Sequence, residues 1–124
     1  MRFLQARTIA AMVDLFAGFA VSDYDRALQW YRLLLGRDPS FHPNDREAVW
    51  EVGEHCYVYF EVLPDRAGGA LSMVMVEDVD GTVSEISGRG IEPLRSEHYE
   101  GGMRKVVYQD PDGNELSFGG ISPK

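Results

Sequence analysis

The feature that most constrains the fold of this chain is an internal repeat. The segment Val21-Ser22-Asp23-Tyr24-Asp25 returns 55 positions later as Val76-Glu77-Asp78-Val79-Asp80. Each copy ends an apolar run and begins a stretch with helical spacing. A chain of 124 residues has room for one compact domain, so the repeat predicts one domain built from two half-length copies.

Both copies predict the same order of elements: a strand, a helix and then three strands. In the first copy, Ser22 and Asp25 have the spacing of a capping box, and Gly36 ends a well-marked helix. In the second copy, Gly90 ends a weaker helix with one apolar ridge. The strands expected after the helices are residues 39–42, 48–52 and 57–63, and then 91–95, 103–108 and 115–118. Module one is therefore predicted over about residues 12–63, a linker over 64–70 and module two over about 71–120.

Alternation along the strands predicts which side chains lie away from the helices. A half of this size can scarcely bury its own sheet face, so the halves should pair and enclose a concave cup. The predicted lining is Phe16, Tyr57, Tyr59, Glu61, Leu71, Met73, Met75, Glu115 and Ser117. Trp50 could belong either to this lining or to the opposite face. Such a lining is typical of a small-molecule pocket, although the same side chains could fill a collapsed core or a dimer seam.

Composition excludes several kinds of partner. The net charge of −8 and the pI near 4.7 disfavour nucleic acids and anionic membranes. The uncharged segment 15–22 is far too short to span a membrane, and residues 1–10 are interpreted as a leader or packing arm. A single cysteine, Cys56, excludes a disulfide framework and is compatible with a reducing cytoplasm, where we expect the protein.

The repeat, Trp30-Tyr31 before Leu34-Leu35-Gly36, and the turn Asp110-Pro111-Asp112-Gly113-Asn114 resemble the vicinal oxygen chelate superfamily. This superfamily groups glyoxalase I, extradiol dioxygenases and bleomycin-resistance proteins, and the resemblance covers roughly residues 13–119. It implies an α+β fold in which two paired βαβββ modules form a curved eight-stranded sheet around a central cup. It also implies a homodimer in which the cup is completed across two chains.

Metal-dependent members of the superfamily hold their ion with side chains at four strand positions. The resemblance places three of these positions at Phe16, Leu71 and Ser117, and the fourth at Tyr59 or Glu61. Phe and Leu offer no donor atom, and a Ser hydroxyl is a poor substitute for a carboxylate. We therefore expect no metal and no other cofactor, and metal-dependent glyoxalase, dioxygenase or epimerase activity is disfavoured.

The histidines do not share the spacing of metal ligands. Among them, His98 is the best functional candidate, because His98-Tyr99-Glu100-Gly101-Gly102 has the composition of a mobile loop that could close over the cup. His98 and Tyr99 are therefore included among the predicted ligand-binding residues.

These patterns favour a metal-independent small-molecule-binding protein similar to the bleomycin-resistance branch. Its ligand would be a flat aromatic or cationic compound held for sequestration or resistance, with Glu61 or Glu115 pairing with positive charge. The alternative is a glyoxalase-like isomerase, cyclase or lyase in which Glu61 or Glu115 is the general base. A third hypothesis is a metal enzyme with displaced ligands Glu61, Glu115 and His98.

Overall fold

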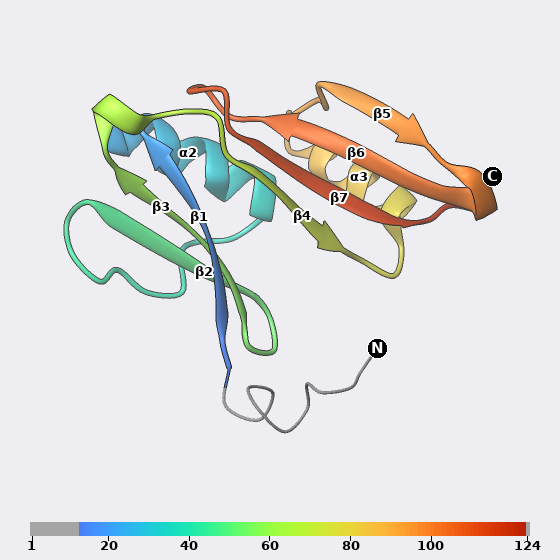
Figure 1. Cartoon of the computed structure of the whole chain (residues 1–124), viewed down its shortest axis with the longest axis horizontal. Coiled ribbons are helices and arrows are strands. Elements are labelled where there is room, and N and C mark those ends of the chain that lie inside the picture. Colours follow the sequence, from blue (N-terminus) through green and yellow to red (C-terminus); the bar gives the residue numbers. More distant parts are fainter. Residues whose placement is uncertain (1–12, 124) are drawn as a thin grey trace.

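The computed structural model describes residues 13–123, and the predicted leader or packing arm lies outside them. Its elements are β1 (Leu15–Val21), α2 (Tyr24–Leu35), β2 (Glu47–Gly53), β3 (Cys56–Val62), β4 (Leu71–Met75), α3 (Val79–Gly88), β5 (Arg95–His98), β6 (Met103–Gln109) and β7 (Glu115–Ile121). A short 3-10 helix, Pro64–Arg66, lies in the predicted linker. Figure 1 shows two sheets side by side with both helices on the same side of them. Within the described residues no helix is long and apolar enough to cross a membrane.

The two sheets repeat one topology, which confirms the predicted α+β fold of two related modules. Sheet one has the order β1-β3-β2 and sheet two the order β4-β7-β6-β5. In each sheet the first strand of the module is parallel to the last strand, and the remaining neighbours are antiparallel. The repeat seen in the sequence is therefore a repeat of strand pairing as well.

Two predicted strands differ from the structure: one is absent, which leaves seven strands in the described sheets instead of eight, and the other is shifted along the chain. Residues 39–42 form one bridge, between Phe41 and Val49, and no strand. Pro39 and Pro43 flank this bridge and cannot donate to a ladder, which explains why it does not extend. The strand expected at residues 91–95 instead begins at Arg95, after Pro93.

The core lies between the helices and the helix-facing sides of both sheets. Phe19, Tyr31 and Phe60 from module one join Ile86 and Phe118 from module two in a single buried cluster. Within residues 13–123 no strand pairing connects the two sheets, so this shared core and the contacts around it hold the modules together.

The N-terminus of each helix is capped by the same residue of the repeat. The Asp23 carboxylate accepts a hydrogen bond from the Arg26 amide at 2.8 Å, and the Asp78 carboxylate accepts one from the Gly81 amide at 2.9 Å. The capping-box spacing predicted Ser22 as the cap of α2, but the structure shows that the cap is Asp23. Ser22 has a different role, because its side chain is directed to module two.

The turn between β6 and β7 connects the two modules through hydrogen bonds. The Asp112 carboxylate accepts from both the amide and the hydroxyl of Ser22, at 3.0 and 2.6 Å. The Asn114 side-chain amide donates to the Ala20 carbonyl at 2.8 Å. We call this arrangement the inter-module latch.

A buried hydrogen bond between Tyr31 and Asp110 adds to the inter-module latch. The Tyr31 hydroxyl donates to Asp110 at 2.8 Å, and Asp110 also accepts from the amides of Asp112 and Asn114. Burial, followed by the negative charge of Asp110, raises the pKa of Tyr31 well above its ordinary value. The hydroxyl therefore keeps the proton that it donates.

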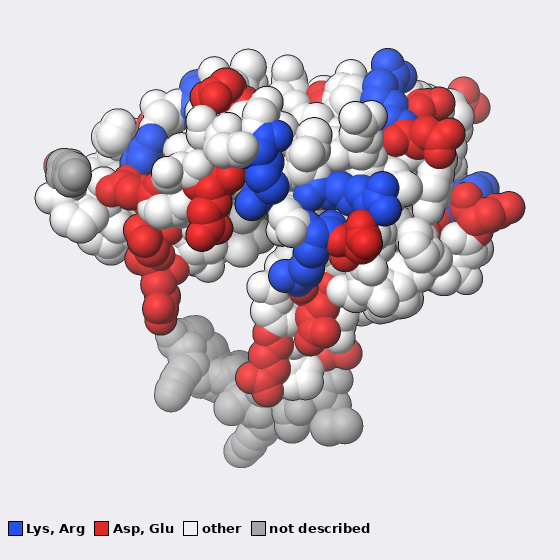
Figure 2. Space-filling view, turned by 180° about the vertical axis from the view of Figure 1, so that it is seen from behind, with Lys and Arg blue, Asp and Glu red and all other residues white. Residues whose placement is uncertain are grey.

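The C-terminus of α2 is also tied to module two. The Arg89 guanidinium, just beyond α3, donates to the carbonyls of Leu33 and Leu34 at 2.5 and 2.8 Å. A positive charge at this position satisfies the free carbonyls and complements the helix dipole. Figure 2 shows charged side chains of both signs spread over the helix side of the molecule.

Removing the Asp112 carboxylate should destabilise the whole domain. We expect Asp112→Ala to lower the free energy of unfolding by about 2 kcal/mol, because two charge-assisted hydrogen bonds between the modules are lost. Urea unfolding should show a lower midpoint with an unchanged slope. The matched control is Asp45→Ala, which removes the same charge from an exposed loop and should cost less than about 0.5 kcal/mol. Equal midpoints for the two variants would contradict the role of the latch.

Candidate functional site

The face of sheet one that points away from the helices carries an aromatic platform, defined here as Phe16, Tyr57 and Tyr59. The rings of Phe16 and Tyr57 stack with centroids 4.4 Å apart and planes 10° apart. Tyr59 meets Phe16 edge to face at 6.2 Å. The Tyr59 ring lies over Gly18, where a Cβ atom would be 2.6 Å from the ring, so the absence of a side chain at Gly18 allows this placement.

An acidic pair borders the platform. Glu47 and Glu61 are opposite each other on β2 and β3, and Arg46 forms an ion pair with Glu61 at 3.3 Å. Burial, followed by the negative charge of Glu61, raises the pKa of Glu47 above its ordinary value. A hollow of about 390 Å³ beside this pair is lined by Phe16, Phe41, Pro43, Glu47, Val49 and Tyr59.

The corresponding face of sheet two carries a methionine cluster. A Cβ atom on Gly119 would lie 3.0 Å from Met75 Sδ, 3.1 Å from Met73 Sδ and 3.0 Å from Met103 Cε. Leu71 and Met75 are 77% and 59% exposed, so this face is open to solvent in the single chain. A further hollow of about 350 Å³ lies between the two sheets, where Tyr57, Met73 and Met75 line it together with helix-facing residues such as Ala17, Val58 and Val74.

A polar network runs along the far edge of the open face of sheet two. The Arg95 guanidinium donates to Glu97 at 2.7 Å and to Glu115 at 3.3 Å. The Tyr99 hydroxyl donates to the other oxygen of Glu97. These hydrogen bonds, that from Tyr99 first and that from Arg95 next, lower the pKa of Glu97. The network borders a hollow of about 220 Å³ lined by Leu71, Ser72, Met73, Arg95, Lys105, Glu115 and Ser117.

Most of the predicted lining lies on these two open faces. The structure brings Phe16, Tyr57 and Tyr59 together, with Glu61 beside them. It separately brings Leu71, Met73, Glu115 and Ser117 together around one hollow. Both predicted glutamates have an arginine partner in the same chain, a feature that alternation alone could not indicate.

Trp50 does not belong to the lining. Its side chain is completely buried in the core, and its indole N–H donates to the Arg37 carbonyl at 2.9 Å. A ligand on the open faces therefore cannot contact it. The sequence allowed either face of the sheet for Trp50, and the structure places it on the helix side.

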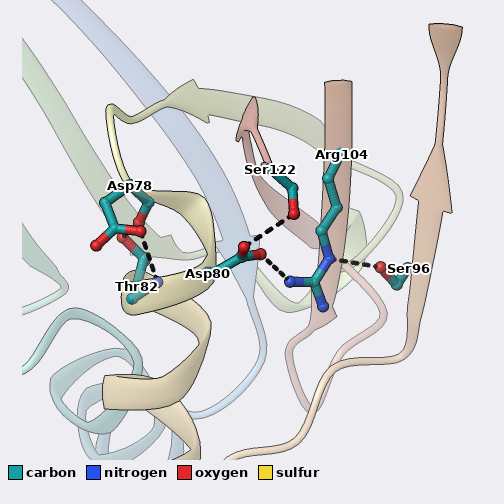
Figure 3. Close-up of polar contacts among 7 residues, drawn as sticks. Asp78, Asp80, Thr82, Ser96, Arg104 and Ser122 are labelled. Atoms are coloured by element: carbon teal, nitrogen blue, oxygen red, sulfur yellow. Dashed lines mark hydrogen bonds and ion pairs between the residues drawn. The ribbon is translucent and has the colours of Figure 1, made fainter. Parts of the chain in front are cut away.

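His98 also lies on the helix side of its sheet. Strand alternation places it on the same face as Ser96, which accepts a hydrogen bond from Arg104 Nε at 3.1 Å. Figure 3 shows Arg104 joining this serine to Asp80 on α3. His98 therefore cannot join Glu61 and Glu115 around one ion within this chain. Tyr99, by contrast, is on the open side with Glu97.

Strand pairing decides the fourth position at which the resemblance places a metal ligand. On sheet two, Leu71 pairs with Glu115, and Ser117 lies two residues further along β7. On sheet one, Phe16 pairs with Tyr57, and Tyr59 lies two residues further along β3. The counterpart of Ser117 is therefore Tyr59 and not Glu61. The four side chains include no carboxylate and no imidazole, so they do not fit a divalent cation. Residues 13–123 contain no group of three or more His, Cys, Asp or Glu side chains that could hold a metal ion.

Sequence reasoning missed Arg95, Glu97, Met103 and Lys105. The strand that carries the first two was expected to end at Arg95, but it begins there, and so its alternation was never assigned. Pro93 was the available signal, because a ladder strand is expected to follow a proline rather than contain it. Met103 and Lys105 lie on a strand that was predicted, but its two faces had not been assigned.

The polar network predicts a measurable change in carboxyl titration. In Tyr99→Phe we expect the pKa of Glu97 to rise toward its ordinary value, because the largest contribution that lowers it is removed. In the wild type, the stabilisation from this carboxylate is present above the ordinary Glu pKa and is lost as the pH falls through the lower folded value. NMR titration of the Glu97 carboxyl carbon measures the shift. Tyr24→Phe, which removes a hydroxyl bonded to His42, should leave it unchanged, and an identical midpoint in Tyr99→Phe would contradict the assignment.

Comparison with known proteins places this geometry in a family. A model of the Glyoxalase/Bleomycin resistance protein/Dioxygenase superfamily matches residues 13–118. The crystal structure of a glyoxalase/bleomycin resistance protein from Catenulispora acidiphila DSM 44928 is 46% identical, with a TM-score of 0.86 over 90% of this chain and 100% of that chain. Among curated proteins, no sequence matches significantly.

Two more distant structures share the fold. A bleomycin-binding protein complexed with bleomycin is 19% identical, with a TM-score of 0.70 over 90% of this chain and 100% of that chain. Lactoylglutathione lyase from Agrobacterium tumefaciens is 17% identical, with a TM-score of 0.70 over 90% and 93% of the two chains. One fold thus carries both a binding protein and an enzyme. Because the family model matches most of its length, this chain belongs to the glyoxalase/bleomycin resistance protein/dioxygenase superfamily.

Proposed function

We propose that this protein binds a flat aromatic small molecule without using a metal ion, and sequesters it. The observation that carries the proposal is the aromatic platform on an open sheet face, at positions that cannot hold a divalent cation. Phe16 is exposed although it stacks on Tyr57, and such a platform offers ring faces to a further aromatic group. The structural neighbour that holds bleomycin is a precedent for ligand binding on this fold.

The binding site of a single chain is incomplete, and we propose that a second copy completes it. The exposed large apolar side chains include Phe16, Leu71, Met73 and Met75, all on the open faces, whereas the helix side carries charged groups of both signs (Figure 2). Contiguous apolar patches of this kind mark interaction surfaces. A two-fold arrangement that sets sheet one of each copy against sheet two of the other covers both patches at once.

The geometry supports the aromatic part of the predicted ligand more than the cationic part. Glu61 pairs with Arg46 and Glu115 pairs with Arg95, so a cationic ligand would have to displace an arginine from either glutamate. Ring stacking on Phe16 requires no such exchange. The exposed free thiol of Cys56 supports a reducing cytoplasm as the place of this activity.

One observation favours the enzyme alternative. Glu47, whose pKa is raised by burial and by Glu61, faces Glu61 across the strands beside an apolar hollow. A carboxyl group whose pKa is raised beside a second carboxyl group can serve general acid–base chemistry. The binding protein remains our first proposal, because the Arg46 ion pair occupies Glu61.

Assembly through the open faces should be prevented by one negative charge introduced on the methionine cluster. We expect the wild-type protein to sediment as a dimer at micromolar concentration and Met73→Glu to sediment as a monomer, because a buried unpaired carboxylate is costly at an apolar interface. Leu33→Glu is the control, since Leu33 is partly exposed on α2, and this variant should remain a dimer. Sedimentation velocity distinguishes these outcomes. A monomeric wild type, or a dimeric Met73→Glu variant, would exclude the proposed assembly.

Ligand binding should depend on the aromatic platform and not on metal. We expect calorimetry in the presence of EDTA to show binding of at least one flat aromatic probe among bleomycin, 9-aminoacridine and 2-naphthamide. Phe16→Ala should weaken that binding about ten-fold, because a stacking surface is lost, whereas Leu33→Ala should not. The absence of binding by every probe would refute the proposal. Turnover that is lost in Glu61→Gln while binding is retained would favour the enzyme instead.

A further inference from the structure

The hollow on sheet two is lined by a lysine whose charge acts on Glu97 only from beyond the distance of an ion pair. Lys105 lines this hollow, is half-buried, and forms no ion pair within 4.0 Å among residues 13–123. We propose that Lys105 binds the carboxylate of an aromatic acid, with Ser117 as a second donor. This inference rests on the proposed binding function and names the chemical class of its ligand.

The polar network explains why Lys105 is available. Glu97 is directly opposite Lys105 on the neighbouring strand, which would ordinarily favour a cross-strand ion pair. Both oxygens of Glu97 are instead taken, one by Arg95 and one by Tyr99. Glu115, the other carboxylate at this hollow, is paired with Arg95 as well. Arg95 therefore donates to both carboxylates, and the ammonium of Lys105 keeps no hydrogen-bonded carboxylate among residues 13–123.

Ser117 supplies the second donor from the floor of the same hollow. Its residue is only 3% exposed, yet it lines the hollow, and its hydroxyl has no hydrogen-bond partner among residues 13–123. Among the described residues, the buried side-chain polar atom that lacks a partner is the Tyr108 hydroxyl, so the Ser117 hydroxyl is reached by solvent in the hollow and can donate to a bound group. A ligand oxygen that accepts from Ser117 while it pairs with Lys105 would satisfy both groups.

The charge and shape of the hollow favour a carboxylate over other anions. Lys105 offers one ammonium group without a hydrogen-bonded acid, which suits a singly charged carboxylate better than a phosphate dianion, because Glu97 and Glu115 lie nearby. The hollow of about 220 Å³ accommodates a carboxylate with part of a ring, and the side chains of Leu71 and Met73 provide an apolar wall for that ring. The rest of a flat ligand would extend toward the methionine cluster and the hollow between the two sheets.

A glutamate of the second copy is the competing counter-ion. If a partner's carboxylate met Lys105 in the dimer, removing the lysine would weaken the dimer and leave ligand preference unchanged. If a ligand carboxylate occupies this position, removing the lysine changes ligand preference and leaves dimer affinity unchanged. The same variant therefore separates the two interpretations.

The experiment compares three probes that differ in charge on one ring system: 2-naphthoate, 2-naphthamide and 2-naphthylmethylammonium. Calorimetry on the full chain should show that wild type binds 2-naphthoate about ten-fold more tightly than 2-naphthamide, because an ionised acceptor adds a charge-assisted hydrogen bond. The ammonium probe should bind more weakly than both. High salt should reduce the preference for the naphthoate.

The variants use the fact that the chain has only two lysines, Lys105 and Lys124. Lys105→Met keeps the length of the side chain and should remove the preference for 2-naphthoate while changing the affinity for 2-naphthamide less than about two-fold. Lys105→Arg should retain the preference. Lys124→Met removes the same charge elsewhere and should behave as wild type.

The outcomes distinguish failure of the carboxylate inference from failure of the proposed aromatic binding. Equal affinity for the three probes, or preference for the ammonium, overturns the carboxylate inference and leaves the proposed aromatic binding standing. An unchanged preference in Lys105→Met, or a weaker dimer with no change in preference, also overturns it. Failure of all three probes to bind wild type, together with failure of bleomycin and 9-aminoacridine, counts against the proposed function itself.

Discussion

The hydrogen bonds between the 110–114 turn and the end of β1 are the interaction on which the rest of the structure depends. Within residues 13–123 no strand pairing joins the two sheets, so without this latch the modules would be held by apolar contact and by the Arg89 bonds at the far end of α2. Apolar contact is non-directional and fixes position weakly, whereas the Asp112 carboxylate accepts two bonds from Ser22 in defined directions. The buried bond from Tyr31 to Asp110 adds a second fixed point inside the core. The angle between the two sheets is therefore set by polar geometry.

That angle decides which faces remain open. Because α2 is attached to module two at both ends, by Ser22 and by Arg89, the two helices lie together behind the sheets and share one core. The opposite faces cannot then bury each other within the same chain. The aromatic platform and the methionine cluster are left exposed by the contacts that stabilise the domain. The contacts that stabilise the single chain are thus also the cause of its exposed apolar faces.

The sequence predicted the parts of this fold that follow from local periodicity. Alternation correctly assigned Phe16, Tyr57 and Met73 to the open faces, since a strand of alternating residues leaves little choice. It could not decide the face of Trp50, because Ala48, Val49 and Trp50 form an apolar run without alternation. It also could not find the latch, since hydrogen bonds between residues 90 positions apart, such as Ser22 and Asp112, leave no local pattern. Ser22 therefore looked like a helix cap.

Net charge and local charge lead to different conclusions about the ligand. The overall charge of −8 attracts cations at a distance, but this attraction is screened beyond about 8 Å in physiological salt. At contact, the nearest groups dominate, and on sheet two the nearest uncommitted group is Lys105. An acidic protein can therefore select an anionic ligand, provided that its carboxylates are already paired, as Glu97 and Glu115 are with Arg95. Arg95 holds both acids of the hollow by hydrogen bonds, and the ammonium of Lys105, which has no hydrogen-bonded acid, is left to select the ligand.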